Sequence, residues 1–170
     1  MTMLTSSSSI LLWQDVIKDA EDQCAIRLAT EIESYLVWLL HRYTTKPDMV
    51  RKVVATAFLE ALQLQERERT ASLQLVGDHC LLYTGLFPHA QQRRLVKINY
   101  FVALGRAAYM GMSNQKNDLY DALSVQFVPL MDVLQSIRPQ PDLLPLEAYD
   151  QWKELGSLRA LKILRSYTKS

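Results

Sequence analysis

Apolar residues recur every three or four positions along most of the chain, and this helical period constrains the fold more than any other feature. No segment shows the strict two-residue alternation of a half-buried strand, and none carries the turn residues of a β-hairpin. No fixed repeat of the kind found in solenoid proteins is present. We therefore predict an all-α fold, built as a single irregular bundle of seven to eight helices.

Most of the first eight residues are small and polar, so we expect residues 1–8 to form a frayed terminus and residues 9–170 to form one helical domain. The first helix should begin at the end of the serine run and bury Leu12, Val16 and Ala20. A chain of 170 residues buries roughly 70% of its unfolded surface, which is enough for a core without metal or disulfide.

Caps and breakers set the boundaries of the next helices. Thr30 followed by Glu33 is a capping box, and Pro47 suits the first turn of a helix. Gly85 and Pro88 should break a helix, and Pro129 should kink or split another. The helices predicted after the first span about 30–43, 47–62, 66–83, 99–112, 118–137, 147–155 and 157–167.

The C-terminal part begins after a connector stiffened by Pro139, Pro141 and Pro145. Gly156 fits a left-handed helix C-cap, and Ser157 can cap the last helix. That helix carries cations on about one face, beside apolar positions, which suits anionic lipid, a docked partner or the body of the protein. We favour packing onto the body, beside the acidic stretch of the first helix. The cations are Arg159, Lys162, Arg165 and Lys169.

The formal net charge is +1, so the overall charge does not favour nucleic acid as a partner. The start of the chain lacks the basic segment of a signal peptide, and no apolar run reaches the roughly 18 residues of a transmembrane helix. Cys24 and Cys80 lie far apart in apolar helical contexts, which favours buried free thiols over a disulfide. These features predict a cytoplasmic protein without a transmembrane segment.

A three-part motif occupies the middle of the chain. It reads GDHCLLYTGLFP at residues 77–88, RR at 93–94 and NYFVALGRAAY at 99–109. With this motif the chain resembles a family of uncharacterised helical proteins found in proteobacteria, whose pattern runs roughly GD..L...G.FP, then RR, then YY...GR.AY. The resemblance implies a bacterial helical protein and supplies no catalytic residues. The chain departs from the pattern at Tyr100-Phe101, where a tyrosine pair is more usual.

The same middle stretch is locally basic, because no Asp or Glu occurs between Asp78 and Asp118. Its cations and aromatic rings form a set typical of an anion or single-strand site. In the alternative, structural interpretation, the rings are core and Asp78 forms a buried ion pair with Arg106, with Gly77 and Gly105 letting the two helices approach closely. The candidate ligand-binding residues are Arg93, Arg94, Lys97, Tyr100, Arg106 and Tyr109.

Motifs that carry familiar chemistry are missing from the sequence. It has no CxxC pair, no HExxH helix, no P-loop, no dinucleotide-binding glycine motif and no nucleophile elbow, so we expect no metal and no cofactor. Cys80 with His79, or with the distant His41 or His89, is the one nucleophile pairing to consider, and nothing in the sequence orders it.

The leading hypothesis is a non-enzymatic bacterial module that binds a protein partner or a small anionic ligand through the surface from His89 to Arg106. One alternative is an enzyme acting on an anionic substrate, in which the arginines hold charge and Asp78, His79 or Tyr109 moves protons. Another is a nucleic-acid-linked regulator that uses the same basic stretch. We expect a monomer or a small homo-oligomer.

Overall fold

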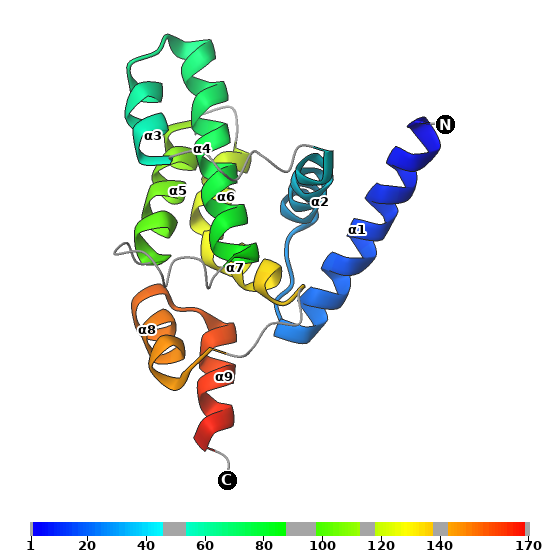
Figure 1. Cartoon of the computed structure of the whole chain (residues 1–170), viewed down its shortest axis with the longest axis vertical. Coiled ribbons are helices and arrows are strands. Elements are labelled where there is room, and N and C mark those ends of the chain that lie inside the picture. The colour runs from blue at the N-terminus through cyan, green and yellow to red at the C-terminus, as the bar shows by residue number, and fades with distance from the viewer. Residues whose placement is uncertain (1, 46–53, 88–97, 113–117, 138–142, 169–170) are drawn as a thin grey trace.

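The computed structural model describes residues 2–45, 54–87, 98–112, 118–137 and 143–168. Every regular element within these ranges is an α-helix, so the predicted all-α bundle is confirmed (Figure 1). The helices are α1 (Thr2–Cys24), α2 (Thr30–Thr45), α3 (Val54–Leu62), α4 (Glu66–Leu86), α5 (Ile98–Met112), α6 (Asp118–Val125), α7 (Phe127–Gln135), α8 (Pro145–Leu155) and α9 (Leu158–Thr168). None of these helices is both long enough and apolar enough to cross a bilayer.

Helix α4 lies at the centre of the bundle, where it packs against α3, α5 and α7 (Figure 1). All of its residues from Val76 to Leu82 are buried. A helix enclosed in this way must be apolar around most of its circumference. Two polar side chains, Asp78 and His79, nevertheless lie in this stretch, and each needs partners inside the protein.

Glycines allow α4 to approach its neighbours. A Cβ atom on Gly105 of α5 would lie 2.8 Å from Cys80 Cβ, and one on Gly85 would lie 2.5 Å from Leu134 Cβ of α7. The fourth helix continues through Gly85 to Leu86, three residues beyond the predicted end at Tyr83, so it ends after Gly85, and Pro88 lies outside the described residues. Gly85 serves instead as a close contact between α4 and α7, which local sequence signals do not distinguish from a helix break.

Helix α1 begins at Thr2, so the serine run is helical and the first helix starts earlier than the predicted start near Ser9. The face of α1 that is buried also differs from the predicted one. Leu12 is 63% exposed, whereas Ile17, Ala20 and Cys24 are buried against the body. The apolar residues of α1 are spread around the helix, so periodicity alone did not fix which of them face inward.

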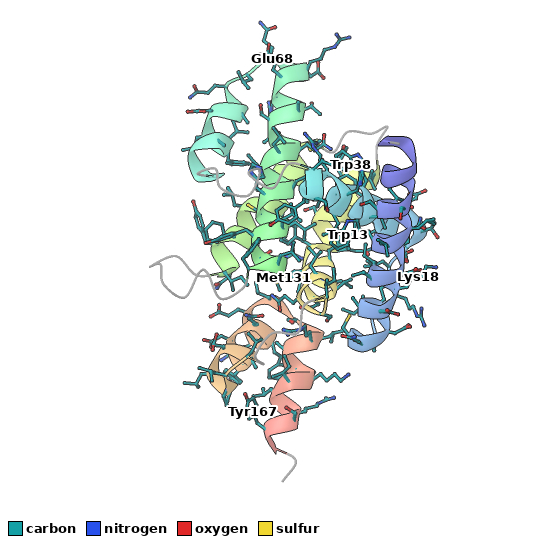
Figure 2. All side chains as sticks on the ribbon, turned by 45° about the vertical axis from the view of Figure 1, so that its right-hand side comes forward. Trp13, Lys18, Trp38, Glu68, Met131 and Tyr167 are labelled. Atoms are coloured by element: carbon teal, nitrogen blue, oxygen red, sulfur yellow. The ribbon has the colours of Figure 1, made fainter. Side chains whose placement is uncertain are left out.

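Two side-chain contacts attach the N-terminal half of α1 to α2. Trp13 Nε1 donates to Thr44 Oγ1 at 3.2 Å, and Ser9 Oγ lies 3.2 Å from His41 Nδ1. Figure 2 shows Trp13 on α1 and Trp38 on α2, with Met131 of α7 among the side chains that fill the centre. The serine run is therefore tied to the rest of the protein through Ser9.

Helix α2 begins at Thr30, close to the predicted start. The amide of Glu33, which the capping box assigned to the Thr30 hydroxyl, donates instead to the carbonyl of Ala29 at 2.9 Å. Pro47, the predicted start of the next helix, lies outside the described residues, and the described part of that helix is α3.

The predicted sixth helix is split at Gln126 into α6 and α7, which confirms the break expected from Pro129. Pro129 falls in the first turn of α7, where a missing N–H costs nothing because amides there have no helical partner. The split explains why nine helices lie in the described ranges when seven to eight were predicted.

Helices α8 and α9 form a pair at the lower end of the molecule (Figure 1). Gly156 ends α8 with φ 71°, and the Ser157 hydroxyl accepts the amide of Ala160 at 3.0 Å, so both predicted caps are confirmed. Lys162 Nζ donates to the carbonyl of Gln23 at 3.0 Å. This contact places one cation of α9 against the C-terminal end of α1, in agreement with the predicted packing onto the body.

Candidate functional site

The predicted ligand-binding residues do not form one surface in the described part of the chain. Tyr100 is 47% exposed and packs edge-on against Phe101, whereas Tyr109 on the same helix is fully buried. Three further candidates, Arg93, Arg94 and Lys97, lie outside the described residues, as does His89.

Arg106 does not pair with Asp78, so the predicted buried ion pair is wrong. The Arg106 guanidinium donates to the carbonyl oxygens of Ser124 at 3.1 Å and Val125 at 3.5 Å, and Ser124 Oγ donates back to the Arg106 carbonyl at 3.0 Å. Pro129 has no N–H, so it cannot donate to the Val125 carbonyl as an unbroken helix would require. Arg106 therefore satisfies the carbonyl end of α6 at the break.

Asp78 is held instead by two tyrosines from other helices. Tyr35 Oη of α2 and Tyr109 Oη of α5 both donate to Asp78 Oδ1, at 2.5 and 2.7 Å. Gln74 Nε2 in turn donates to Tyr35 Oη at 3.3 Å. Gly77 makes room for this arrangement, because a Cβ atom there would lie 2.5 Å from the Tyr109 ring. The glycine thus permits a close approach, as predicted, but to a ring rather than to a helix backbone.

The protonation of this cluster is set by burial. Burial raises the pKa of the Asp78 carboxyl to about 6, although the hydrogen bonds from Tyr35 and Tyr109 and the charge of Arg42 favour its ionised form. Burial and the nearby carboxylate also raise the pKa of the Tyr35 and Tyr109 phenols, so both stay protonated donors. Asp78 Oδ2 is fully buried and accepts no hydrogen bond from any residue that the structure describes.

Aromatic rings enclose Asp78. The Tyr35 ring centroid lies 5.4 Å from that of Trp38 and 6.2 Å from that of Tyr120, and the Tyr109 and Tyr120 rings stack at 6.3 Å. These are the separations of rings in direct contact. The cluster can hold a proton and join α2, α4, α5 and α6, but the packed rings do not leave Asp78 open to a substrate.

Metal and thiol chemistry find no support among the described residues. These residues contain no group of three or more His, Cys, Asp and Glu side chains that could hold a metal ion. Cys24 and Cys80 are both buried and free of disulfides, as predicted. Burial raises the pKa of the Cys80 thiol to about 12, so the thiolate that a nucleophile requires is disfavoured.

A second buried acid joins the C-terminal helices to the body. Asp132 of α7 accepts the Ser157 hydroxyl at 2.7 Å and the Arg159 amide at 3.5 Å, while the Arg159 guanidinium donates to Gln135 Oε1 at 2.8 Å. Burial raises the pKa of Asp132 to about 6. Because Asp132 receives donors from the N-terminus of α9, it fixes the position of that helix and of α8 packed against it.

Helix α8 presents three lengthwise stripes of residues, spaced three or four positions apart. The buried stripe packs inward and consists of Ala148, Gln151 and Leu155. The aromatic stripe faces outward and consists of Leu146, Tyr149 and Trp152, which are 79%, 39% and 38% exposed. The acidic stripe runs on the other side of Leu146 and consists of Glu147, Asp150 and Glu154.

Side chains of the aromatic stripe contact one another and a neighbouring lysine. The rings of Tyr149 and Trp152 meet at 6.1 Å, and Lys153 Nζ lies 5.5 Å from the Tyr149 ring centroid. Sequence analysis did not identify this face. The three-residue spacing of Leu146, Tyr149 and Trp152 was a usable signal, but a stripe of this kind is usually a core face.

No family model matches the chain, and neither a curated protein nor a solved structure matches it. The resemblance to the proteobacterial family therefore remains a prediction that rests on the motif at residues 77–109.

Proposed function

We propose that this chain is a non-enzymatic helical module that binds a protein partner, and that the outward face of α8 makes the contact. The observation that carries the proposal is the exposed aromatic stripe of Leu146, Tyr149 and Trp152. Single exposed apolar residues are common on protein surfaces, whereas a row of them on one helix is typical of an interaction site. Tryptophan and tyrosine are also enriched among the residues that dominate binding energy.

This face adjoins part of the surface that the sequence predicted. Asn99 Nδ2, in the first turn of α5, donates to Glu154 Oε2 of α8. Tyr100 follows Asn99 and is about half exposed. The contact supports a partner surface that extends from α8 toward the start of the predicted stretch on α5.

The alternatives have less support. A small anionic ligand would need Arg106 and Tyr109, but Arg106 is bonded to the end of α6 and Tyr109 is buried. An enzyme that moves protons with Asp78 would need substrate to reach a carboxyl that packed rings enclose. Arg93 and Arg94 remain candidates for an anion site.

The test is a comparison of captured proteins from a native lysate. Wild type is compared with a Tyr149→Ala, Trp152→Ala variant and with a Leu11→Ala, Leu12→Ala control. The control removes apolar side chains of α1 that are more exposed than the two rings. We expect a protein that wild type and the control both retain and that the α8 variant loses. Retention by all three would remove the α8 face from consideration.

An Arg93→Ala, Arg94→Ala variant extends the comparison to the sequence-based surface. Loss of the same partner from this variant alone would move the contact from α8 to the arginine pair. Circular dichroism of each variant checks that the helical fold is intact.

A further inference from the structure

We propose that α8 and α9, the C-terminal pair, dock reversibly on the body of the protein as one unit, and that a proton on Asp132 of α7 favours the docked state. This device concerns how α8 is held rather than what α8 binds, so it stands independently of the proposed function. It also bears on that function, because docking sets the position of the aromatic stripe relative to the body.

The C-terminal pair has a small apolar core of its own. In the described residues, Leu143, Ala148 and Ala160 form a buried cluster separate from the main core. Apart from Leu155, no described apolar side chain of α8 or α9 packs against the main core. Since hydrophobic stabilisation follows the apolar area removed from water, it holds the two helices together but contributes little to their docking.

The joint between the C-terminal pair and the body is polar instead. Asp132 and Gln135 of α7 are buried there, as is Ser157 before the start of α9. The Ser157 hydroxyl donates to Asp132 Oδ1 at 2.7 Å, and the Arg159 guanidinium donates to Gln135 Oε1 at 2.8 Å. On the buried stripe of α8, Gln151 Oε1 accepts no hydrogen bond from any described residue, which makes docking less favourable. Polar joints of this kind are typical of parts that move relative to one another.

Docking determines the surroundings of the Asp132 carboxyl. In the docked state the start of α9 lies against this carboxyl, which is 1% exposed, and burial raises its pKa to about 6. When the C-terminal pair leaves, the carboxyl meets water and its pKa returns toward the ordinary value of 3.8. The docked state therefore binds the proton more tightly. Docking is strongest below about pH 4 and weakens as the pH rises through about 6.

The other ionisable groups that face Asp132 do not reverse this sign. The Asp132 charge and burial raise the pKa of the Cys24 thiol of α1, so this thiol stays neutral over the same range. Arg159 of α9 favours the ionised form of Asp132, yet the pKa of Asp132 remains raised with that charge in place. Helix α4 contributes the uncharged carbonyl of Thr84, which accepts from Gln135 Nε2 at 3.1 Å. The proton on Asp132 is therefore the one that links docking to pH.

Hydrogen exchange of the full chain, followed by mass spectrometry from pH 4 to pH 8, tests the proposal. Helices as short as α8 and α9, with 11 residues each, are marginal in water by themselves, so undocking exposes their amides to exchange. After correction for the intrinsic exchange rate, the protection of α8 and α9 should fall together as the pH rises. The expected fall is up to about 100-fold, from a pKa of 3.8 undocked and about 6 docked. Peptides from the central helix α4 should stay better protected at each pH.

Two matched variants assign the pH dependence to one carboxyl. Asp132→Asn should remove most of the change in α8 and α9, because asparagine can accept the same hydrogen bonds but does not titrate. Asp78→Asn removes the other buried carboxyl with a pKa of about 6, which is bonded to α2 and α5, and should leave the change in α8 and α9 intact. Persistence of the change in Asp132→Asn, or its loss in Asp78→Asn, would overturn the role of Asp132.

Wild type alone decides the matter if Asp132→Asn does not fold. Equal protection of α4, α8 and α9 at every pH would mean that the C-terminal pair leaves only when the whole protein unfolds, which would overturn reversible docking. Faster exchange of α9 without α8 would overturn the single unit. Protection of the pair that stays constant or rises with pH would overturn the effect of the proton. Each of these results is independent of whether the α8 face binds a protein.

Discussion

Substituting Asp78 with asparagine should reduce the pH dependence of the protein's stability. Burial raises the pKa of the Asp78 carboxyl from its ordinary value of 3.8 to about 6 in the folded protein. In the unfolded chain the carboxyl is solvated and returns to the ordinary value. The folded state therefore binds the proton more tightly. The resulting stabilisation is complete below about pH 4 and is lost as the pH rises through about 6.

The size of the change in unfolding free energy follows from the rise in the pKa of Asp78. A rise of about two pKa units corresponds to about 3 kcal/mol. Asp78 is fully buried, so solvent screening should reduce this little. Asparagine keeps an oxygen that can accept from Tyr35 and Tyr109 but does not titrate. Relative to wild type, the Asp78→Asn variant should therefore gain about 3 kcal/mol between about pH 4 and about pH 8.

The assay is urea unfolding, followed by circular dichroism, at a series of pH values. The ionisable groups that face Asp78 are Tyr35 and Arg42 of α2, Tyr109 of α5 and Tyr120 of α6. A Tyr109→Phe variant removes one donor to the carboxylate, so it should strengthen the pH dependence that Asp78→Asn weakens. Unfolding free energies of wild type and Asp78→Asn that stay parallel over this range would refute the reasoning.

Three other substitutions and one thiol reaction test the packing. In thermal melts, Gly85→Ala should destabilise the fold by about 1–3 kcal/mol, because the new Cβ atom would meet Leu134 Cβ. Gly111→Ala should be neutral or stabilising, because its Cβ atom would meet only the end of a side chain. Arg106→Ala should lower the free energy of unfolding by about 1 kcal/mol, because the contacts to the end of α6 are lost. A decrease of about 3–5 kcal/mol would instead support the buried ion pair with Asp78. Cys80 in the native protein should react slowly with Ellman's reagent, and rapid labelling would contradict its burial and high pKa.

Features encoded within a few residues could be predicted from the sequence. The start of α4 at Glu66, the left-handed Gly156 and the Ser157 cap depend on local backbone preferences. Pro129 likewise predicted the split between α6 and α7, because its missing N–H removes a helical hydrogen bond regardless of how the helix is packed.

Features that depend on distant packing were not predictable. Asp78 is bonded to Tyr35, 43 residues away, and to Tyr109, 31 residues away. Opposite charge suggested Arg106 as the partner, but the broken end of α6 supplied that arginine with carbonyl acceptors. Sequence spacing cannot reveal such competition between partners.

The outward face of α8 was missed for a related reason. Two of its three stripes contain apolar residues. The stripe with the larger side chains, which includes Trp152, is the one expected to face the core. The bundle buries the smaller stripe that contains Ala148, since a small side chain permits close packing. The choice between the stripes is made by the neighbouring helices.

Site-specific photocrosslinking tests the central claim, that α8 contacts a protein partner, most directly. Tyr149 is replaced by benzoylphenylalanine in the full chain, and Leu12 is replaced in the same way as an exposed control on α1. Irradiation in a native lysate should give a discrete covalent adduct from position 149 and none of the same mass from position 12. Equal adducts from both positions, or none from position 149, would contradict the claim.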